Sequence, residues 1–184
     1  TATALAWTMH RVLTEPGVLD RIRAELDAVV GRGPVAPEHL GRLEYLDAVV
    51  KETLRLNPVI PDVLRILKRP LSIGGVALPA GVGVAPNIYG AHRRPESWPE
   101  PTRFDPGRFL GTRPGPYEFF PFGGGVRRCL GMAFALYEMK VVLATLLARA
   151  DFTLAPGYGV RVVRRNVTWG PSGGMPVVLR RRAA

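Results

Sequence analysis

The sequence predicts a mainly α-helical fold with several small β-sheets, an α+β class. Apolar residues recur at helical spacing in long stretches near both ends of the chain, which predicts amphipathic or buried helices. Short runs rich in Val, Ile and Leu alternate with glycine and proline, which predicts short strands joined by turns. With 184 residues, 47% hydrophobic and 22% charged, the chain is long enough for a core and has a globular composition.

Helices are predicted first over residues 1–14, 16–30 and 42–56. The first residues already resemble the interior of a helix, with no start signal before them. Pro16 fits the first turn of the second helix, and the third stops before Pro58, which disfavours a helical residue ahead of it. We therefore expect the C-terminal part of a longer protein, in which a lost N-terminal anchor stays an open alternative.

The middle of the chain predicts short strands and then a long loop. Glycine and proline turns separate the expected strands, and a short helix follows them. A proline-rich stretch with many aromatics predicts a packed loop. These elements span residues 63–67, 71–73, 76–78 and 82–85 for the strands, 87–92 for the helix and 95–121 for the loop.

The last third of the chain predicts one long helix and a β-rich tail. Residues 130–149 are apolar nearly all round, so we expect a buried helix packed on both sides. Strands are expected at 152–154, 160–163 and 177–179, with turns at 170–174. Residues 181–184 are expected to form a disordered tail.

Charge and cysteine content narrow the classes of function. The net charge is +10, but the basic residues are spread along the chain without a basic helix carrying base-stacking aromatics, which argues against nucleic-acid binding. A single cysteine excludes an internal disulfide and favours a reducing, cytoplasmic location. No uncharged apolar stretch is long enough to predict a membrane span.

Cys129 lies between a glycine-rich loop and the long helix, and it is the residue most suggestive of chemistry. The positive end of the helix dipole and the neighbouring Arg127 and Arg128 favour a thiolate over a thiol. Gly123 and Gly131 let the backbone approach a flat ligand closely. A buried thiolate with one open face suits the axial position of a haem iron. The alternative is a small buried hydrophobic residue, the common role of a lone cysteine.

The segment at 119–131, FFPFGGGVRRCLG, reads F-x-x-G-x-R-x-C-x-G. This pattern resembles the haem-binding motif of the cytochrome P450 family, the haem-thiolate monooxygenases. The resemblance covers essentially the whole chain in the right order. It implies the C-terminal portion of the cytochrome P450 fold, as one partial domain over residues 1–184. Residues 95–121 would be its meander, residues 122–131 its cysteine loop, and haem b its cofactor.

Glu52 and Arg55 stand three apart on the third predicted helix and match the family's E-x-x-R motif. From the residues alone, the pair reads as a solvated ion pair stabilising the helix by about 0.2–0.5 kcal/mol. The resemblance instead implies a structural triad with Arg108, in a segment similar to the family's F-x-P-E-R-F. Gly107 departs from that pattern where glutamate is usual.

The resemblance also implies contacts to the cofactor and to oxygen. Arg127 and Arg65 would bind the haem propionates, because a planar guanidinium suits carboxylates. Phe122 would shield the thiolate, with core packing as its alternative, and Gly123 and Gly131 would also contact haem. Thr1 resembles the second threonine of the family's doublet, so the oxygen-activating threonine would be the preceding residue. A shift of one position would make it Thr1, which is kept as the catalytic candidate of this chain. His92 is interpreted as structural, because no second ligand lies at metal-binding spacing.

The implied substrate contacts are mostly apolar, which indicates an apolar organic substrate, with O2 as the second substrate. Electrons would come from a redox partner, a ferredoxin, flavodoxin or reductase, docking near Arg128 and Lys140. Two alternatives stay open: a non-catalytic haem-binding or sensing module, and an inactive, incomplete chain that binds haem weakly alone. The expected pocket residues are Val59, Ile60, Val63, Leu64 and Ser172.

Overall fold

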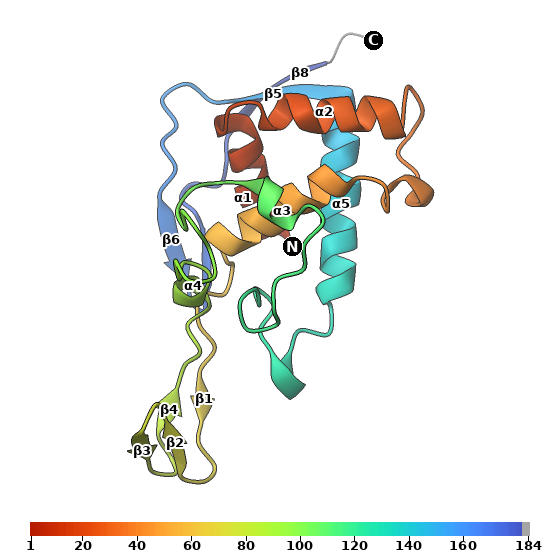
Figure 1. The fold of residues 1–184 in the computed structure, drawn as a ribbon. Helices are drawn as coiled ribbons and strands as arrows, with labels where there is room; N and C mark the ends of the chain where they lie inside the picture. Colours follow the sequence, from red (N-terminus) through yellow and green to blue (C-terminus); the bar gives the residue numbers. More distant parts are fainter. Residues whose placement is uncertain (182–184) are drawn as a thin grey trace.

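A computed structural model describes residues 1–181, and its helices cluster around one hydrophobic core (Figure 1). Helix α1 spans Ala2–Thr14, α2 spans Val18–Val29, α3 spans Glu44–Leu56 and α5 spans Met132–Arg149. Each helix contributes buried apolar side chains at the spacing expected for an inward-facing stripe. The predicted α+β class, helices with small sheets, is confirmed.

Helix α3 runs through the centre of this cluster, and nearly all of its residues are buried. Its N-terminus is fixed by Glu25 of α2, whose carboxylate accepts the backbone N–H groups of Tyr45 at 2.6 Å and Leu46 at 3.0 Å. An anion at this position satisfies first-turn donors and complements the helix dipole. The helix ends at Leu56, ahead of Pro58 as the sequence predicts.

Within residues 1–181 the strands form four antiparallel pairs. In the β2–β3 hairpin the expected strand limits are confirmed, and Gly74 and Gly75 between them have φ of 58° and 81°. Positive φ at both positions is what a tight two-residue hairpin turn requires. Figure 1 shows this hairpin and the β1–β4 pair reaching away from the helices. The strands are β1 (Arg65–Ile66), β2 (Leu71–Ile73), β3 (Val76–Leu78), β4 (Gly83–Val84), β5 (Ala150–Leu154), β6 (Val162–Arg165), β7 (Thr168–Pro171) and β8 (Val177–Arg181), paired as β1–β4, β2–β3, β5–β8 and β6–β7.

Short helical turns punctuate the connecting segments: η1 (Pro37–His39), α4 (Ile88–Ala91), η2 (Pro106–Phe109) and η3 (Gly125–Arg127). The long loop around η2 is packed, as predicted from its aromatics. Trp98 and Phe109 are buried with ring centroids 5.7 Å apart, and Phe119 lies 4.9 Å from Phe109. Tyr117 is an exception, because 82% of its surface is exposed.

Two of the expectations that proved wrong concern β7 and α5. Strand β7 includes positions 170 and 171 of the segment predicted as turns, and a Cβ at Gly170 would lie 3.2 Å from Cγ2 of Thr3 on α1. Helix α5 is buried on one face only, with Phe134 70% exposed on the other. No element among residues 1–181 covers that second face. The expected tail at 181–184 lies outside the described residues except for position 181, which ends β8.

Across residues 1–181, no helix combines the length and apolar character needed to cross a bilayer.

Candidate functional site

The cysteine loop is a closed turn between the meander and α5. The backbone N–H of Cys129 donates to the carbonyl of Phe122 at 3.0 Å, so the two ends of the loop meet. Gly123 and Gly125 have φ of 73° and 64°, a region that residues with a side chain rarely adopt. Arg128 donates its N–H to the carbonyl of Gly125 at 3.1 Å and closes the η3 turn inside the loop.

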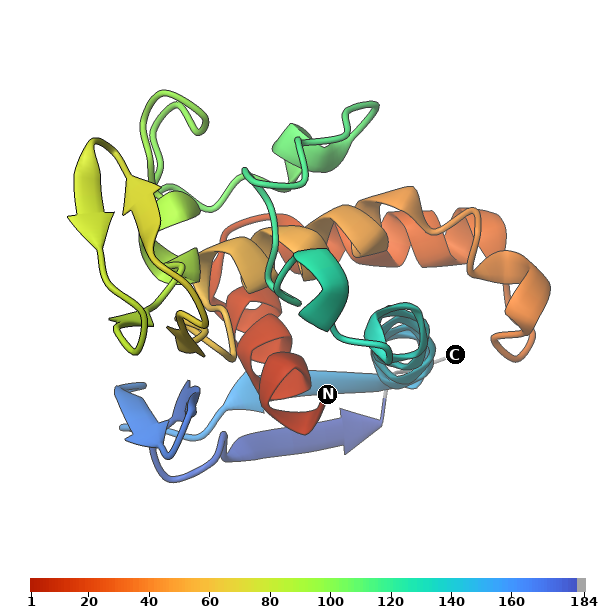
Figure 2. The same cartoon turned by 90° about the horizontal axis from the view of Figure 1, so that it is seen from below.

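A cavity of about 260 Å³ opens between this loop, the start of α1, the segment after α3 and the first half of α5. Figure 2 views α5 nearly end-on and shows the loop beside α1 and α3. The lining residues are largely apolar and include one cysteine and one arginine. The lining residues are Thr1, Ala4, Leu54, Val59, Ile60, Val63, Ile88, Pro121, Phe122, Gly123, Arg127, Cys129, Ala135 and Met139.

Most of the candidate site residues meet in this cavity. The cysteine loop contributes Phe122, Gly123, Arg127 and Cys129, the segment after α3 contributes Val59, Ile60 and Val63, and Thr1 lies at the start of α1. Residues that the sequence did not single out complete the walls: Ala4, Leu54, Ile88, Pro121, Ala135 and Met139. In the sequence these residues look like ordinary core positions, and nothing distinguishes them from the apolar residues that lie outside the cavity.

The other candidates lie outside the lining. Leu64 is 63% exposed, whereas its neighbours Val63 and Arg65 are partly buried. The guanidinium of Arg65 donates to the carbonyl of Leu64 at 2.9 Å. The Ser172 hydroxyl accepts the N–H of Arg161 at 3.3 Å, next to the end of β7. The expectation that Leu64 and Ser172 line the pocket is therefore not met by this structure.

Gly131 precedes α5 as its N-cap residue, two positions after the cysteine. The thiol of Cys129 is exposed, which corrects the expectation of a buried sulfur. The helix also begins later than predicted, at Met132, so Cys129 lies in the loop ahead of the first turn. The neighbours Val126 and Leu130 are fully exposed too. The sulfur is exposed because no element among residues 1–181 packs over this side of the loop.

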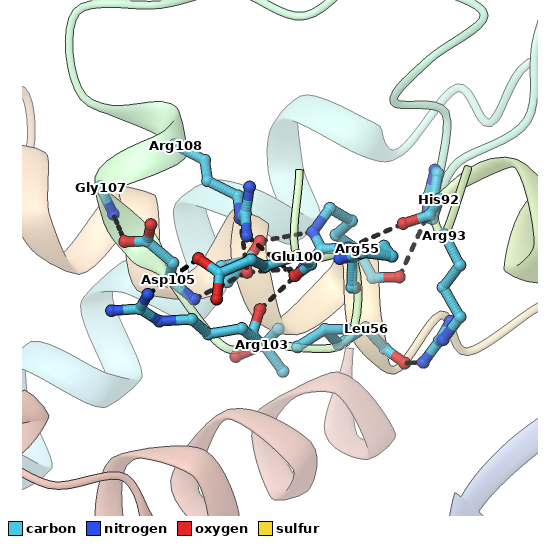
Figure 3. A network of polar contacts seen from close by, with 12 residues as sticks. Arg55, Leu56, His92, Arg93, Glu100, Arg103, Asp105, Gly107 and Arg108 are labelled. Atoms are coloured by element: carbon cyan, nitrogen blue, oxygen red, sulfur yellow. Dashed lines mark hydrogen bonds and ion pairs between the residues drawn. The ribbon is translucent and has the colours of Figure 1, made fainter. Parts of the chain in front are cut away.

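Behind the cysteine loop, α3 carries a buried ion pair (Figure 3). Arg55 donates to Glu52 through Nε at 2.6 Å and Nη2 at 2.8 Å, a bidentate contact. Both side chains are 0% exposed, which contradicts the interpretation as a solvated surface pair. Arg108 approaches from η2, with its Nε 3.6 Å from Oε1 of Glu52. The structure thus brings together the three residues of the predicted triad.

The remaining polar groups of this pair hold the meander in place. Arg55 donates to the carbonyl oxygens of His92 at 2.7 Å, Pro101 at 2.7 Å and Arg103 at 3.1 Å. Oε1 of Glu52 also accepts the backbone N–H of Asp105 at 2.8 Å. One buried pair therefore satisfies backbone groups along the connecting segment from α4 to η2, a structural task that requires both charges.

His92 is fully buried and lies against this network. Its Nδ1 is 3.2 Å from the carbonyl oxygen of Arg55, and its Nε2 accepts the N–H of Phe120 at 3.0 Å. Burial lowers the pKa of His92 from 6.5 to about 4; the positive charges of Arg55 and Arg93 add to this, and the Arg55 carbonyl partly offsets it. His92 is therefore neutral at physiological pH.

We expect acid to destabilise the protein through His92. The unfolded chain binds this proton near pH 6.5 and the folded chain only near pH 4, so the stabilisation present above pH 6.5 is lost as the pH falls to 4. At about 1.4 kcal/mol per tenfold difference, the loss is about 3 kcal/mol. Denaturant unfolding at several pH values should show a flatter dependence in His92→Gln, and equal slopes would contradict the assignment.

The donor set in the cavity fits a haem. The iron requires an axial ligand, and Cys129 is among the residues that line the cavity. Propionate groups require a cation, and Arg127 is among the residues that line the same space. The macrocycle requires apolar surroundings, which Val59, Ile60 and Phe122 supply together with most of the other wall residues.

Comparison with known proteins gives a consistent result. The cytochrome P450 family model matches residues 1–175. A putative cytochrome P450 135B1 of Mycobacterium bovis is 40% identical over 180 residues, covering 98% of this chain and 37% of the relative. The taurochenodeoxycholic 6 alpha-hydroxylase of Sus scrofa is 40% identical over 159 residues, covering 85% of this chain and 31% of the relative.

A solved structure shows the same fold. The crystal structure of a cytochrome P450, CYP102L1, matches this chain with a TM-score of 0.85 and 34% sequence identity, over 98% of this chain and 42% of that one. The chain thus spans 37% of the length of its Mycobacterium relative. The haem-compatible cavity, the family model and the shared fold together establish that this chain belongs to the cytochrome P450 family, whose cofactor is haem.

Proposed function

We propose that the protein is a haem-dependent monooxygenase, which inserts one oxygen atom of O2 into an apolar organic substrate with electrons from a redox partner. The observation that carries this proposal is the shared cavity. Cys129 and Arg127 line it together with the apolar segment after α3 and the start of α1. The chain spans only 37% of its Mycobacterium relative, so the activity is proposed for the complete protein.

Cys129 would hold the cofactor, and thiolate-ligated haem iron supplies the cleavage of the O–O bond. Arg127 would bind a propionate from inside the cavity. Arg65 would bind the other, because it lies two residues after Val63, which lines the cavity, and its guanidinium forms no ion pair among residues 1–181. Phe122 would exclude water from the sulfur side, and Gly123 and Gly131 would leave room for the macrocycle.

The remaining cavity residues would serve the substrates. Thr1 lines the cavity, and its hydroxyl would donate or accept a hydrogen bond close to bound O2. Val59, Ile60 and Val63 form an apolar wall suited to an apolar substrate. The triad around Glu52 has a structural role in this proposal, because both of its buried charges are directed at backbone and at each other.

Turnover by the complete protein tests this proposal. Supplied with NAD(P)H, a ferredoxin and its reductase, it should convert a panel of apolar compounds into products that each gain one oxygen atom. Labelled O2 should place its isotope in the product, while labelled water should not. Haem binding without any oxygenated product across the panel would contradict the proposal and favour a non-catalytic haem module.

We propose that a reduced ferredoxin or flavodoxin with an acidic surface docks beside the cysteine loop, in the cytosol. Arg128 is exposed there and lines a second hollow of about 280 Å³ with Lys51. Lys140, the other expected contact, is mostly buried and binds Asp47 at 3.3 Å and the carbonyl of Leu40 at 3.2 Å. Arg128 is therefore the better candidate for an ion pair with a partner.

Arg128→Glu is expected to slow electron transfer from the partner by about tenfold at low salt, because the reversed charge repels an acidic surface. The difference from the wild type should shrink as salt is added. The measurement is the rate of haem reduction in stopped flow. Arg164→Glu, an exposed change on β6, is the matched control. An unchanged, salt-independent rate in Arg128→Glu would refute docking at this site.

A further inference from the structure

His92 connects two parts of the molecule that are far apart in sequence. It follows α4 as its C-cap residue and is 0% exposed. One ring nitrogen faces the carbonyl of Arg55 on α3, and the other accepts the N–H of Phe120 at the entrance to the cysteine loop. Because the imidazole bridges them directly, the position of the loop entrance depends on the position of α3.

The partners determine the tautomer of the ring. A backbone N–H can only donate, so Nε2 of His92 must accept the bond from Phe120. A carbonyl oxygen can only accept, so Nδ1 must carry the proton directed at Arg55. Only the neutral Nδ1–H form satisfies both partners. The protonated ring would turn a second N–H toward the Phe120 donor and break the bridge.

Packing holds the ring in this orientation. The imidazole stacks on Phe119 with ring centroids 5.4 Å apart and planes 26° apart, and Phe120 meets it edge-on at 5.4 Å and 75°. The guanidinium of Arg55 donates back to the carbonyl of His92 at 2.7 Å (Figure 3). With both nitrogens engaged and both faces restricted, His92 is unavailable as a metal ligand or as a base.

From Phe120 the connection continues to the cysteine through backbone bonds. The carbonyl of Phe120 accepts the N–H of Gly123 at 2.9 Å and forms the turn that opens the loop. One residue before that glycine, the carbonyl of Phe122 accepts the N–H of Cys129 at 3.0 Å. The path from the imidazole to the peptide of Cys129 thus runs through Phe120, Gly123 and Phe122, and hydrogen bonds hold it at both ends and at the turn between them.

We propose that His92 is a positioning residue: its Nδ1–H tautomer transmits the position of the buried Glu52–Arg55 pair to the backbone that presents Cys129. Its effect on the haem rests on the proposed function, whereas its effect on the loop does not. The role is specific to the acceptor at Nε2. A residue that merely fills the same volume would keep the packing and lose the connection.

Three substitutions in the full-length protein separate these roles. Gln can place an oxygen near the position of Nε2 and accept from Phe120, whereas Asn can place an amide near Nδ1 and reach only Arg55. Phe keeps the ring and the stacking without any acceptor. If Phe prevents folding, the Gln and Asn pair decides, because the two differ mainly in which bond they restore.

Two measurements compare the three variants with the wild type. Amide hydrogen exchange over residues 119–123 should become about tenfold faster in His92→Asn and His92→Phe and return close to wild type in His92→Gln. The CO-difference spectrum of the reduced protein should show the thiolate band in His92→Gln and a loss of part of that band in the other two. Equal exchange in Gln and Asn, or wild-type exchange in Phe, would overturn the proposal.

The exchange measurement also separates this proposal from the proposed function. It needs no activity and no assumption about the haem ligand. Suppose that the wild type shows no thiolate band, but that amide exchange is slower in His92→Gln than in His92→Asn. That result would refute the thiolate assignment and support the His92 connection. A normal thiolate band with the same exchange in every variant would support the function and overturn the connection.

Discussion

Glu52→Leu is expected to lower the free energy of unfolding by about 3–5 kcal/mol, because it leaves the buried charge of Arg55 without a counter-ion. Both side chains are 0% exposed, so water cannot replace the lost carboxylate. The backbone N–H of Asp105 loses its acceptor at the same time. Denaturant unfolding of the full-length protein should show a lower midpoint with an unchanged slope.

A matched control is available on the surface. Glu100 and Arg103 form an ion pair at 2.9 Å with the same three-residue spacing, but their side chains are 64–69% exposed. Glu100→Leu should therefore change the free energy of unfolding by about 1 kcal/mol at most. Equal losses in Glu52→Leu and Glu100→Leu would show that burial of the α3 pair does not determine its contribution.

Cys129→Ser is expected to abolish oxygenation of substrate while leaving stability nearly unchanged. A serine hydroxyl is not ionised near neutral pH and cannot supply the electron density of a thiolate to iron. The Cys129 side chain is exposed, so the free energy of unfolding of the haem-free protein should change by about 0.5 kcal/mol or less. Product formation by the haem-loaded protein and denaturant unfolding of its haem-free form check both halves. Oxygenation at the wild-type rate would contradict the proposed ligand.

Much of the scaffold around the site could be predicted from the sequence, because local signals determine it. The Gly74–Gly75 turn defines the β2–β3 hairpin to the residue, since both positions adopt positive φ. The spacing of Glu52 and Arg55 places them one turn apart on α3. Whether that pair is buried depends on tertiary packing, which the spacing alone does not determine. The structural triad came from the resemblance to a family.

Other features depend on tertiary contacts, which the hydrophobic pattern of the sequence does not predict. The apolar composition of α5 predicts cover on both faces, but the described residues cover one face and leave Phe134 exposed. This chain spans 37% of its Mycobacterium relative. Its α5 keeps an apolar composition that suits the complete protein, but the chain does not include all of the segments that would contact the helix there. The exposure of Cys129 has the same explanation.

Glycine and proline in the tail were misread for a related reason. At 170–171 they read as a turn, yet both lie in β7. A Cβ at Gly170 would approach Cγ2 of Thr3 to 3.2 Å, so glycine allows the strand to pass close to α1. Pro171 ends the strand, where a missing N–H is tolerated. The sequence indicates a structural role for His92 but not its two partners, which are 37 and 28 residues away.

The CO-difference spectrum of the reduced full-length protein tests the assignment of Cys129 as the haem ligand most directly. The wild type should show the strongly red-shifted band of a thiolate ligand. Val126→Ser, an exposed change in the same loop, should show the same band. Cys129→Ser should bind CO without it. A normal thiolate band in Cys129→Ser would contradict the assignment.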